Sequence, residues 1–339
     1  MKNAVVFGGM GFIGLHYAKY LLNQKKYNFI YLIDISEPKG KYSLNVYQNL
    51  KSNSSIKIIK KDVRKDLTDI NISKVDIICD FAAVHREPGH ADYEYFETNV
   101  EGSKNICNFA DYVKCVNIIF TSSISVYGPG NHEKNENTKT FPNTAYGKSK
   151  LEAEKNYILW QNKNKNEKIL TICRPGVVFG PGENGNVSRL IKSVKKRFFI
   201  FMGNKYLKKS GIYINELISS ISWVNENQIL KKFKNITLFN GSFHPCPDLE
   251  NYVSAISNQF QNINKFLTVP KIIIKTIIVL TSFITKNLSP LSNYHYKRLN
   301  KLFRSNFVTP EFLVNSNYKF NYNLNSSMQD WKKINSNDW

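Results

Sequence analysis

Tyr146 and Lys150 stand four residues apart, so on a helix they share one face. A free tyrosine has a pKa of about 10, which is too high for a base at neutral pH. A neighbouring ammonium stabilises the phenolate and lowers that pKa. Tyr47 and Lys51 have the same spacing, but only the later pair follows a strand that ends in hydroxyl residues. The sequence therefore predicts acid–base chemistry by Tyr146 with help from Lys150.

A glycine turn near the N-terminus predicts a dinucleotide site. Gly8, Gly11 and Gly14 follow an apolar run directly and open a helical stretch. Such glycines allow a tight turn, a close approach of the pyrophosphate to the backbone, and close helix–strand packing, while the helix N-terminus offers N–H donors. Asp34 comes twenty residues after Gly14 at the end of a second apolar run. A carboxylate there accepts hydrogen bonds from the ribose hydroxyls and repels a 2′-phosphate, so we expect NAD as the cofactor rather than NADP.

These residues require a framework of alternating strands and helices. Buried strands are expected at 3–8, 28–34, 56–60, 75–82, 116–122 and 168–173. Helices are expected at 12–25, 92–112 and 145–162. This order predicts an α/β fold, a Rossmann-type doubly wound parallel sheet with a smaller C-terminal substrate-binding lobe. We place the Rossmann domain at 1–174 and the lobe at 175–339, and we expect its polar tail from Asn321 to be partly mobile.

Composition narrows the class of protein. Lys and Arg number 47 against 26 Asp and Glu, a formal charge of +21 that suits an anionic partner or simply a solvated surface. No basic stripe interleaved with aromatic residues is visible, so nucleic acid is not expected. The five cysteines are odd in number and lack metal-ligand spacing, so no metal is expected, and a reducing cytoplasm fits best. The apolar start is too short for a signal peptide.

The glycine spacing and the motifs that follow resemble the extended short-chain dehydrogenase/reductase family, in its NAD-dependent nucleotide-sugar epimerase/dehydratase branch. The matching pieces come in that family's order: Asp62-Val63, Phe81-Ala82-Ala83, Asn99, Thr121-Ser122-Ser123-Ile124-Ser125-Val126-Tyr127-Gly128, Tyr146-Gly147-Lys148-Ser149-Lys150 and Arg174-Pro175-Gly176-Val177. The resemblance covers residues 3–220 well and the remainder loosely.

The resemblance implies roles for individual residues. Tyr146 is the catalytic acid/base beside Lys150, and Ser123 holds the reacting oxygen, with Ser122 as the alternative. The cofactor-binding residues implied are Gly8, Gly11, Phe12, Ile13, Gly14, Asp34, Asp62, Val63, Ala82, Ala83, Asn99, Tyr146, Lys150, Pro175 and Val177. The substrate-binding residues expected are His85, Arg86, Ser123, Asn186, Arg189 and Lys209. Lys209 stands where the family usually has Arg, and it lacks the bidentate fork of that residue.

The turn after Ser123 separates the reactions of this family. Members that remove water carry a Glu just before the Val-Tyr-Gly turn, where this chain has Ser125. A neutral hydroxyl is a poor base for a carbon acid, so a 4,6-dehydratase is disfavoured. A 4-epimerase and a 4-ketoreductase remain, both acting on a nucleotide-diphosphate sugar, and both are consistent with surface polysaccharide precursor synthesis.

An apolar segment, residues 271–284, keeps other interpretations open. It is shorter than a membrane span and is interrupted by Lys275. A buried or subunit-contact helix is the simpler interpretation, and a peripheral membrane contact is the sharper one. A hydroxysteroid-dehydrogenase-like membrane-associated oxidoreductase is therefore one alternative. A non-catalytic NAD-binding regulatory protein is a second, which does not depend on this segment and which the Ser123, Tyr146 and Lys150 set argues against. We expect a cytoplasmic homodimer, because the family often pairs through two long helices, here 92–112 and 145–162.

Overall fold

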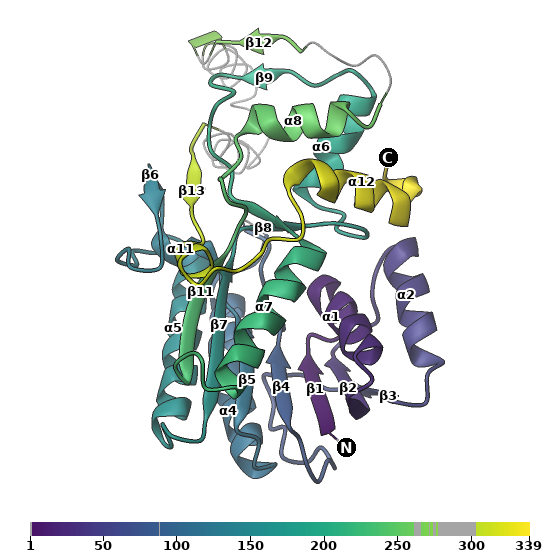
Figure 1. Ribbon diagram of the computed structural model, residues 1–339, viewed down its shortest axis with the longest axis vertical. Helices are drawn as coiled ribbons and strands as arrows, with labels where there is room; N and C mark the ends of the chain where they lie inside the picture. Colours follow the sequence, from purple (N-terminus) through teal and green to yellow (C-terminus); the bar gives the residue numbers. More distant parts are fainter. Residues whose placement is uncertain (1, 88, 261–265, 271, 274–275, 277–302) are drawn as a thin grey trace.

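The computed structural model describes residues 2–87, 89–260, 266–270, 272–273, 276 and 303–339 (Figure 1). The strands are β1 (Lys2–Phe7), β2 (Tyr27–Asp34), β3 (Ile56–Lys60), β4 (Ile77–Asp80), β5 (Asn117–Thr121), β6 (Gly130–Lys134), β7 (Ile169–Pro175), β8 (Val177–Phe179), β9 (Phe201–Met202), β10 (Gly211–Tyr213), β11 (Ile236–Gly241), β12 (Thr268–Val269) and β13 (Asn306–Val308). The helices are α1 (Phe12–Asn23), α2 (Lys41–Lys51), α3 (Asp92–Phe96), α4 (Gly102–Tyr112), α5 (Ala145–Asn162), α6 (Asn186–Lys195), α7 (Ile214–Ile229), α8 (Leu249–Ser257), α11 (Glu311–Asn315) and α12 (Leu324–Ile334). A π-helix, η1 (Glu97–Glu101), and two 3-10 helices, η2 (Ile124–Tyr127) and η3 (Ser336–Asp338), complete these elements.

A parallel sheet of seven strands forms the centre, in the order β11-β7-β5-β4-β1-β2-β3. Ala4 and Val6 of β1 face one hydrophobic core, which α1, α2 and α7 cover. Val5 and Phe7 face the other, which α4 and α5 cover. Because both faces are covered, the strands read as continuous apolar runs. The predicted Rossmann-type α/β fold is confirmed.

The sheet differs from the prediction at its edge. The six expected strands are present, but β11 was not expected, and it pairs with β7 from Ile236 to Gly241. Residues on both sides of position 174 therefore build the sheet, and the division into two lobes there stays a prediction. The expected helix 92–112 is present, but η1 interrupts it.

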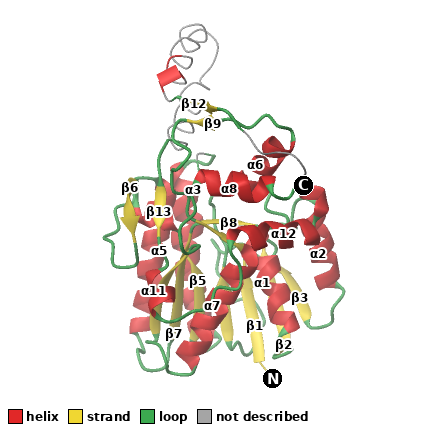
Figure 2. Cartoon of the chain, turned by 45° about the horizontal axis from the view of Figure 1, so that its top comes forward, coloured by secondary structure: helices red, strands yellow, loops and turns green. Residues whose placement is uncertain are grey.

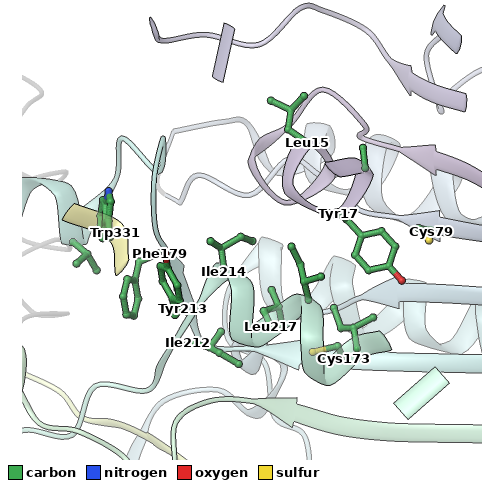
Figure 3. Close-up of a cluster of buried hydrophobic side chains, with 14 of the residues drawn as sticks. Leu15, Tyr17, Cys79, Cys173, Phe179, Ile212, Tyr213, Ile214, Leu217 and Trp331 are labelled. Atoms are coloured by element: carbon green, nitrogen blue, oxygen red, sulfur yellow. The ribbon is translucent and has the colours of Figure 1, made fainter. Parts of the chain in front are cut away.

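The tail from Asn321 is not the mobile segment that its polar composition suggested. Residues Leu324–Ile334 form α12, and Trp331 of this helix is fully buried. Its ring stacks on Phe179, with the ring centroids 6.0 Å apart. Figure 3 shows Trp331, Phe179 and Tyr213 continuing the core that begins with Leu15 and Tyr17 on α1. The tail packs against the core through its few apolar residues, although its average composition is polar.

Within the predicted second lobe, α6, α8, β8, β9 and β12 lie beyond the carboxyl ends of the sheet strands (Figures 1 and 2), whereas β11 is a strand of the sheet and α7 covers it. There β8 pairs with β10, and β9 pairs with β12 at the end of the molecule farthest from the N-terminus. Most of residues 271–284, where the sequence predicts an apolar helix, lie outside the described residues. Among the described residues, no helix is both long and apolar enough to cross a bilayer.

Candidate active site

The turn between β1 and α1 has room for backbone only. Gly8 has a φ of +67°, and a Cβ there would lie 2.6 Å from the backbone nitrogen of Ala82. A Cβ at Gly14 would lie 2.1 Å from the carbonyl oxygen of Gly8. Gly11 is the N-cap of α1 and makes no side-chain cap bond. The helix N-terminus is therefore presented by a turn in which glycines leave the backbone open to approach, as a diphosphate requires.

Asp34 ends β2 beside this turn. Its carboxylate accepts hydrogen bonds from the backbone N–H groups of Met10, at 3.0 Å, and Ile35, at 2.8 Å. Burial raises the pKa of Asp34, and these backbone donors oppose that shift. The carboxyl ends of β1 and β2 thus bring together a carboxylate acceptor, a helix N-terminus without a side-chain cap, and a glycine turn. These residues fit an NAD molecule, whose adenosine ribose would meet Asp34.

Two predicted cofactor residues follow β3. The carboxylate of Asp62 binds the guanidinium of Arg64 at 2.7 Å, and this bond holds the Asp62 pKa below its usual range. Val63 is buried in the core beneath the site, and its carbonyl accepts a bond from Asn105. Val63 thus packs against the interior, and its contact with a cofactor stays a prediction.

The turn after β4 is fixed by Asn99. Its side chain bonds both the backbone N–H and the carbonyl of Val84, and donates to the Ser149 hydroxyl at 2.9 Å. Ala82 and Ala83 form the start of the same turn and are partly exposed. Asn99 sits in the π-helix η1, a distortion that often marks functional sites. Asn99 therefore joins the turn after β4 to α5.

The last predicted cofactor residues lie where β7 passes into β8. Pro175 is buried at the end of β7, opposite Gly241 of β11. Val177 begins β8, is partly exposed, and donates its N–H to the Ser210 carbonyl. Phe12 and Ile13 open α1 and pack against the core while partly exposed.

Ser123 and Tyr146 meet at the carboxyl end of β5. Ser123 is the N-cap of η2, and Tyr146 lies in the first turn of α5, whose N-cap is Thr144. Desolvation raises the pKa of Tyr146 to about 12, and a hydrogen bond with Ser123 opposes that shift. The predicted hydroxyl and the predicted acid/base therefore lie close together.

Lys150 lies one turn further along α5 and is almost fully buried, with 2% of its surface exposed. Its Nζ donates to the carbonyl of Thr121 at 2.8 Å and stands 4.7 Å from the centroid of the Phe120 ring. Burial lowers the pKa of this ammonium to about 8. An ammonium with that pKa is still mostly charged at neutral pH.

The neighbouring serines have separate places. Ser125 donates its N–H to the Ser123 hydroxyl, and Ser123 donates to the Ser125 hydroxyl at 3.1 Å. Ser122 is buried, and its hydroxyl has no hydrogen-bond partner among the residues that the structure describes. Ser123, not Ser122, is therefore the hydroxyl that faces Tyr146.

The loop after β4 contributes residues that sequence reasoning missed. Tyr95 of α3 donates to the carbonyl of Arg86, and its ring centroid lies 6.2 Å from that of Tyr146. The charge of Glu87 acts on Tyr146 and raises its pKa. His85 and Arg86 are exposed on the same loop. Only the local sequence Val84–His90 pointed to this loop, and it singled out the histidine and arginine rather than the carboxylate.

The other predicted substrate residues lie in the second lobe. Asn186 begins α6 and accepts a bond from Arg189 at 2.6 Å, and both side chains are exposed. Lys209 donates to the carbonyl of Arg304 at 2.6 Å, and burial lowers its pKa to about 8. A phosphate contact by these three residues stays a prediction.

Comparisons with known proteins agree with this architecture. Residues 5–268 match the model of the 3-beta hydroxysteroid dehydrogenase/isomerase family. A relative from Escherichia coli O157:H7, N-acetyl-alpha-D-glucosaminyl-diphospho-ditrans,octacis-undecaprenol 4-epimerase, is 35% identical over 60% of this chain and 60% of its own length. A sterol-4-alpha-carboxylate 3-dehydrogenase of Candida albicans is 30% identical over 58% of this chain and 56% of its own. The chain thus spans less than two thirds of the length of these two relatives.

A solved structure covers nearly all of the chain. The UDP-glucuronic acid 4-epimerase of Bacillus cereus in complex with NAD aligns over 99% of this chain and 100% of its own, with a TM-score of 0.74. The two sequences are 18% identical, so this likeness concerns the fold.

Proposed function

The chain belongs to the 3-beta hydroxysteroid dehydrogenase/isomerase family, and we propose that it is an NAD-dependent 4-epimerase of a diphosphate-linked sugar. One observation carries the proposal: Ser123, Tyr146 and Lys150 converge at the carboxyl end of β5. The glycine turn follows the carboxyl end of β1, on the same side of the sheet. This membership agrees with the expected kinship to the extended short-chain dehydrogenase/reductases. The first curated relative, named as a 4-epimerase of a diphosphate-linked sugar, supports the choice of reaction.

The residues divide the chemistry among them. Tyr146 takes the proton of the C4 hydroxyl and later returns one to the C4 oxygen, while Ser123 holds that oxygen by a hydrogen bond. Desolvation raises the Tyr146 pKa to about 12. We assign to the Lys150 ammonium, one turn further along α5, the role of favouring the phenolate against that shift. Bound NAD supplies the hydride acceptor at C4 and a positive charge that favours the phenolate further.

The turn around Ser125 supports an epimerase over a dehydratase. A dehydratase needs a base for the C5 proton, and Ser125 is a neutral hydroxyl bonded to Ser123. Glu87 acts on Tyr146 from a different loop, so it does not replace the base expected at position 125. Transfer at C4 requires only Ser123, Tyr146 and Lys150.

The diphosphate carrier is either a nucleotide, as the sequence suggested, or a polyprenol, as the name of the first relative suggests. The net charge of +21 suits either anion. Asn186, Arg189 and Lys209 are the residues we assign to the diphosphate. A polyprenol carrier would require contact with a membrane.

A surface at the far end of the second lobe supports a peripheral membrane contact. Phe198 is 82% exposed and Leu267 is 77% exposed. The pairing of β9 with β12 brings Leu267 beside the exposed Ile200, because Phe201 N–H donates to the Leu267 carbonyl. The adjacent Lys196 and Arg197 would attract anionic lipid.

Vesicle flotation tests this contact. Binding to vesicles rich in phosphatidylglycerol but not to pure phosphatidylcholine is expected, and the substitution Phe198→Ser should weaken it several-fold. The matched control is Phe141→Ser, which removes another exposed ring, 75% exposed, from a different segment. Equal binding by both variants would refute the contact.

We assign the dimer interface to the outer faces of α3 and α5. Tyr93 of α3 and Leu159 of α5 are each 64% exposed, and Phe96 is 39% exposed. Exposed large apolar side chains such as these favour a partner. Sedimentation should give a dimer that Leu159→Glu converts to a monomer, and a monomeric parent protein would refute the assignment.

A substrate panel tests the function. The purified protein is incubated with UDP-hexoses, their N-acetyl forms, 4-keto-6-deoxy nucleotide sugars and polyprenyl-diphosphate N-acetylhexosamine, with and without NADH. Epimerisation without net NADH consumption is expected, and it should vanish in Tyr146→Phe. Stoichiometric NADH oxidation by the keto sugars would replace the epimerase with a 4-ketoreductase. Full turnover by Tyr146→Phe would contradict the assigned acid/base.

The family description and the sterol dehydrogenase relative favour one second candidate, a 3β-hydroxysteroid oxidoreductase. It would use the same Tyr146 and Lys150. Oxidation of 3β-hydroxysteroids with NAD, without conversion of any sugar, would establish it in place of the epimerase.

A further inference from the structure

Lys150 carries its charge into the protein interior. Only 2% of its surface is exposed, and within the described residues its ammonium donates a hydrogen bond to a neutral carbonyl, that of Thr121. A buried ammonium is costly unless an opposite charge lies near it. An ammonium that is to stay charged here therefore needs an anion within the surrounding core.

Glu154 is one turn away on α5, but its charge is already matched. Both of its oxygens are bound by the guanidinium of Arg174, at 2.9 Å through Nε and at 2.6 Å through Nη2. This two-bond pair is buried between α5 and β7. Arg174 therefore compensates Glu154, and little of that negative charge remains for Lys150.

Asp80 at the end of β4 is the second buried carboxylate near Lys150. It is 3% exposed, and its oxygens accept bonds from the Ala82 N–H at 3.0 Å and the Tyr157 hydroxyl at 2.7 Å. Both donors are neutral, and in the described part of the chain no ion pair shorter than 4.0 Å reaches Asp80. Lys150 is the cation whose charge acts on it.

Thr121 of β5 joins the two residues: its carbonyl accepts a bond from Lys150 Nζ at 2.8 Å, and its hydroxyl donates to the Asp80 carbonyl at 3.2 Å. The two charges act on each other across this junction of β4, β5 and α5. Asp80 raises the pKa of Lys150, more strongly than Glu154 does, and Lys150 lowers the pKa of Asp80. Burial opposes both effects. The other titratable groups coupled to the pair are Glu154 and Tyr157 from α5, Cys107 from α4, Cys79 from β4, and His85 from the loop after β4. Glu87 of that loop acts on Tyr146 instead.

We propose that Asp80 is a positioning residue that keeps Lys150 protonated, so that Lys150 can favour the phenolate of Tyr146. Asp80 touches neither substrate nor cofactor in this scheme and acts only through Lys150. Tyr157 lies two turns beyond Lys150 on α5, and its hydroxyl holds the Asp80 carboxylate in place by a hydrogen bond. The proposal rests on the proposed role of Lys150 beside Tyr146.

The first test is the pH profile of kcat/KM for the NAD-loaded protein. With Asp80→Asn, the alkaline limb should move down by about one pH unit, because Lys150 loses its proton more readily when the anion is gone. Cys107→Ala is the matched control, since it changes a buried side chain of the same core but leaves Asp80, Lys150 and the Tyr157 hydrogen bond in place. Its alkaline limb should stay in place. Coincident profiles for Asp80→Asn and the parent would overturn the proposal.

A second test needs no activity and so separates this proposal from the proposed function. The stabilities of Asp80→Asn, Lys150→Met and the double variant are measured by urea unfolding at pH 7. Asp80→Asn should lower the unfolding midpoint markedly when Lys150 is present and much less in the Lys150→Met background, because only the former leaves a buried charge unmatched. Additive effects of the two substitutions would overturn the coupling.

Discussion

Gly14, in the first turn of α1, packs directly against the carbonyl oxygen of Gly8, and a Cβ at Gly14 would lie 2.1 Å from that oxygen. No real Cβ tolerates such a distance, so the turn and the helix can approach only because Gly14 has no side chain. Gly11, between them, is less confined, since the nearest atom to its Cβ position is 3.2 Å away. Gly14 is therefore required for packing of the helix against the turn, whereas Gly11 leaves space beside the helix N-terminus.

This difference predicts different outcomes for two alanine substitutions. Gly14→Ala should lower thermal stability and abolish NAD binding, because the turn must open to admit the methyl group. Gly11→Ala should leave the ligand-free protein nearly as stable as the parent and weaken NAD at least tenfold, because the methyl group meets the pyrophosphate. Calorimetric unfolding and NAD titration check both. Equal stability of Gly14→Ala and the parent would refute the packing.

Asp34 sets the choice between NAD and NADP. Asp34→Asn keeps the shape of the side chain but removes the charge, so NAD should bind about tenfold more weakly, which corresponds to about 1.4 kcal/mol. NADP should bind more tightly, since the repulsion of its 2′-phosphate is gone. Competition titrations measure the ratio of the two dissociation constants.

Asp62→Asn is the control for this substitution. Asp62 is engaged with Arg64 and follows β3 instead of β2, so its loss should leave the NAD-to-NADP ratio unchanged. If Asp34→Asn left that ratio unchanged as well, Asp34 would not be the ribose contact.

His16 predicts an acid-sensitive fold. Its Nε2 donates to the carbonyl of Pro181 at 3.0 Å, which ties α1 to the loop after β8. Burial lowers the pKa of His16 from 6.5 to about 4. The unfolded chain therefore binds a proton between those pH values that the folded protein does not, so stability is complete above pH 6.5 and falls as the pH drops toward 4.

Urea unfolding at pH 7.5 and pH 5 measures this effect. The parent should lose about 2 kcal/mol more than His16→Gln over this interval, because glutamine keeps a donor for Pro181 but takes up no proton. Identical losses in the two proteins would show that His16 does not cause the acid sensitivity.

Much of the sheet could be predicted because its strands are buried on both faces. In β4, for example, Ile77, Ile78 and Cys79 form an apolar run without alternation, and the glycine turn fixes where the first helix begins. β11 was not predicted because Ile236–Gly241 mixes polar and apolar residues. It becomes a strand of the sheet only through its pairing with β7, which is far away in sequence.

The catalytic pair was accessible for a similar reason. Tyr146 and Lys150 are related by helix spacing, and Ser123 by the end of the adjacent strand, so local sequence is enough to bring the three together. Asp80 and Glu87 carry no such signal. Asp80 ends an apolar strand, Glu87 lies in a polar loop, and only the packing of β4 and the loop against α5 brings each near the pair.

The central claim is reversible hydride transfer at C4 with Tyr146 as the acid/base. The most direct measurement follows a sugar diphosphate labelled with deuterium at C4, converted by the NAD-loaded protein in ordinary water and analysed by NMR. The account predicts the C4 epimer with its deuterium retained, and no product from Tyr146→Phe. Loss of the label to solvent, or unchanged product from that variant, would contradict it.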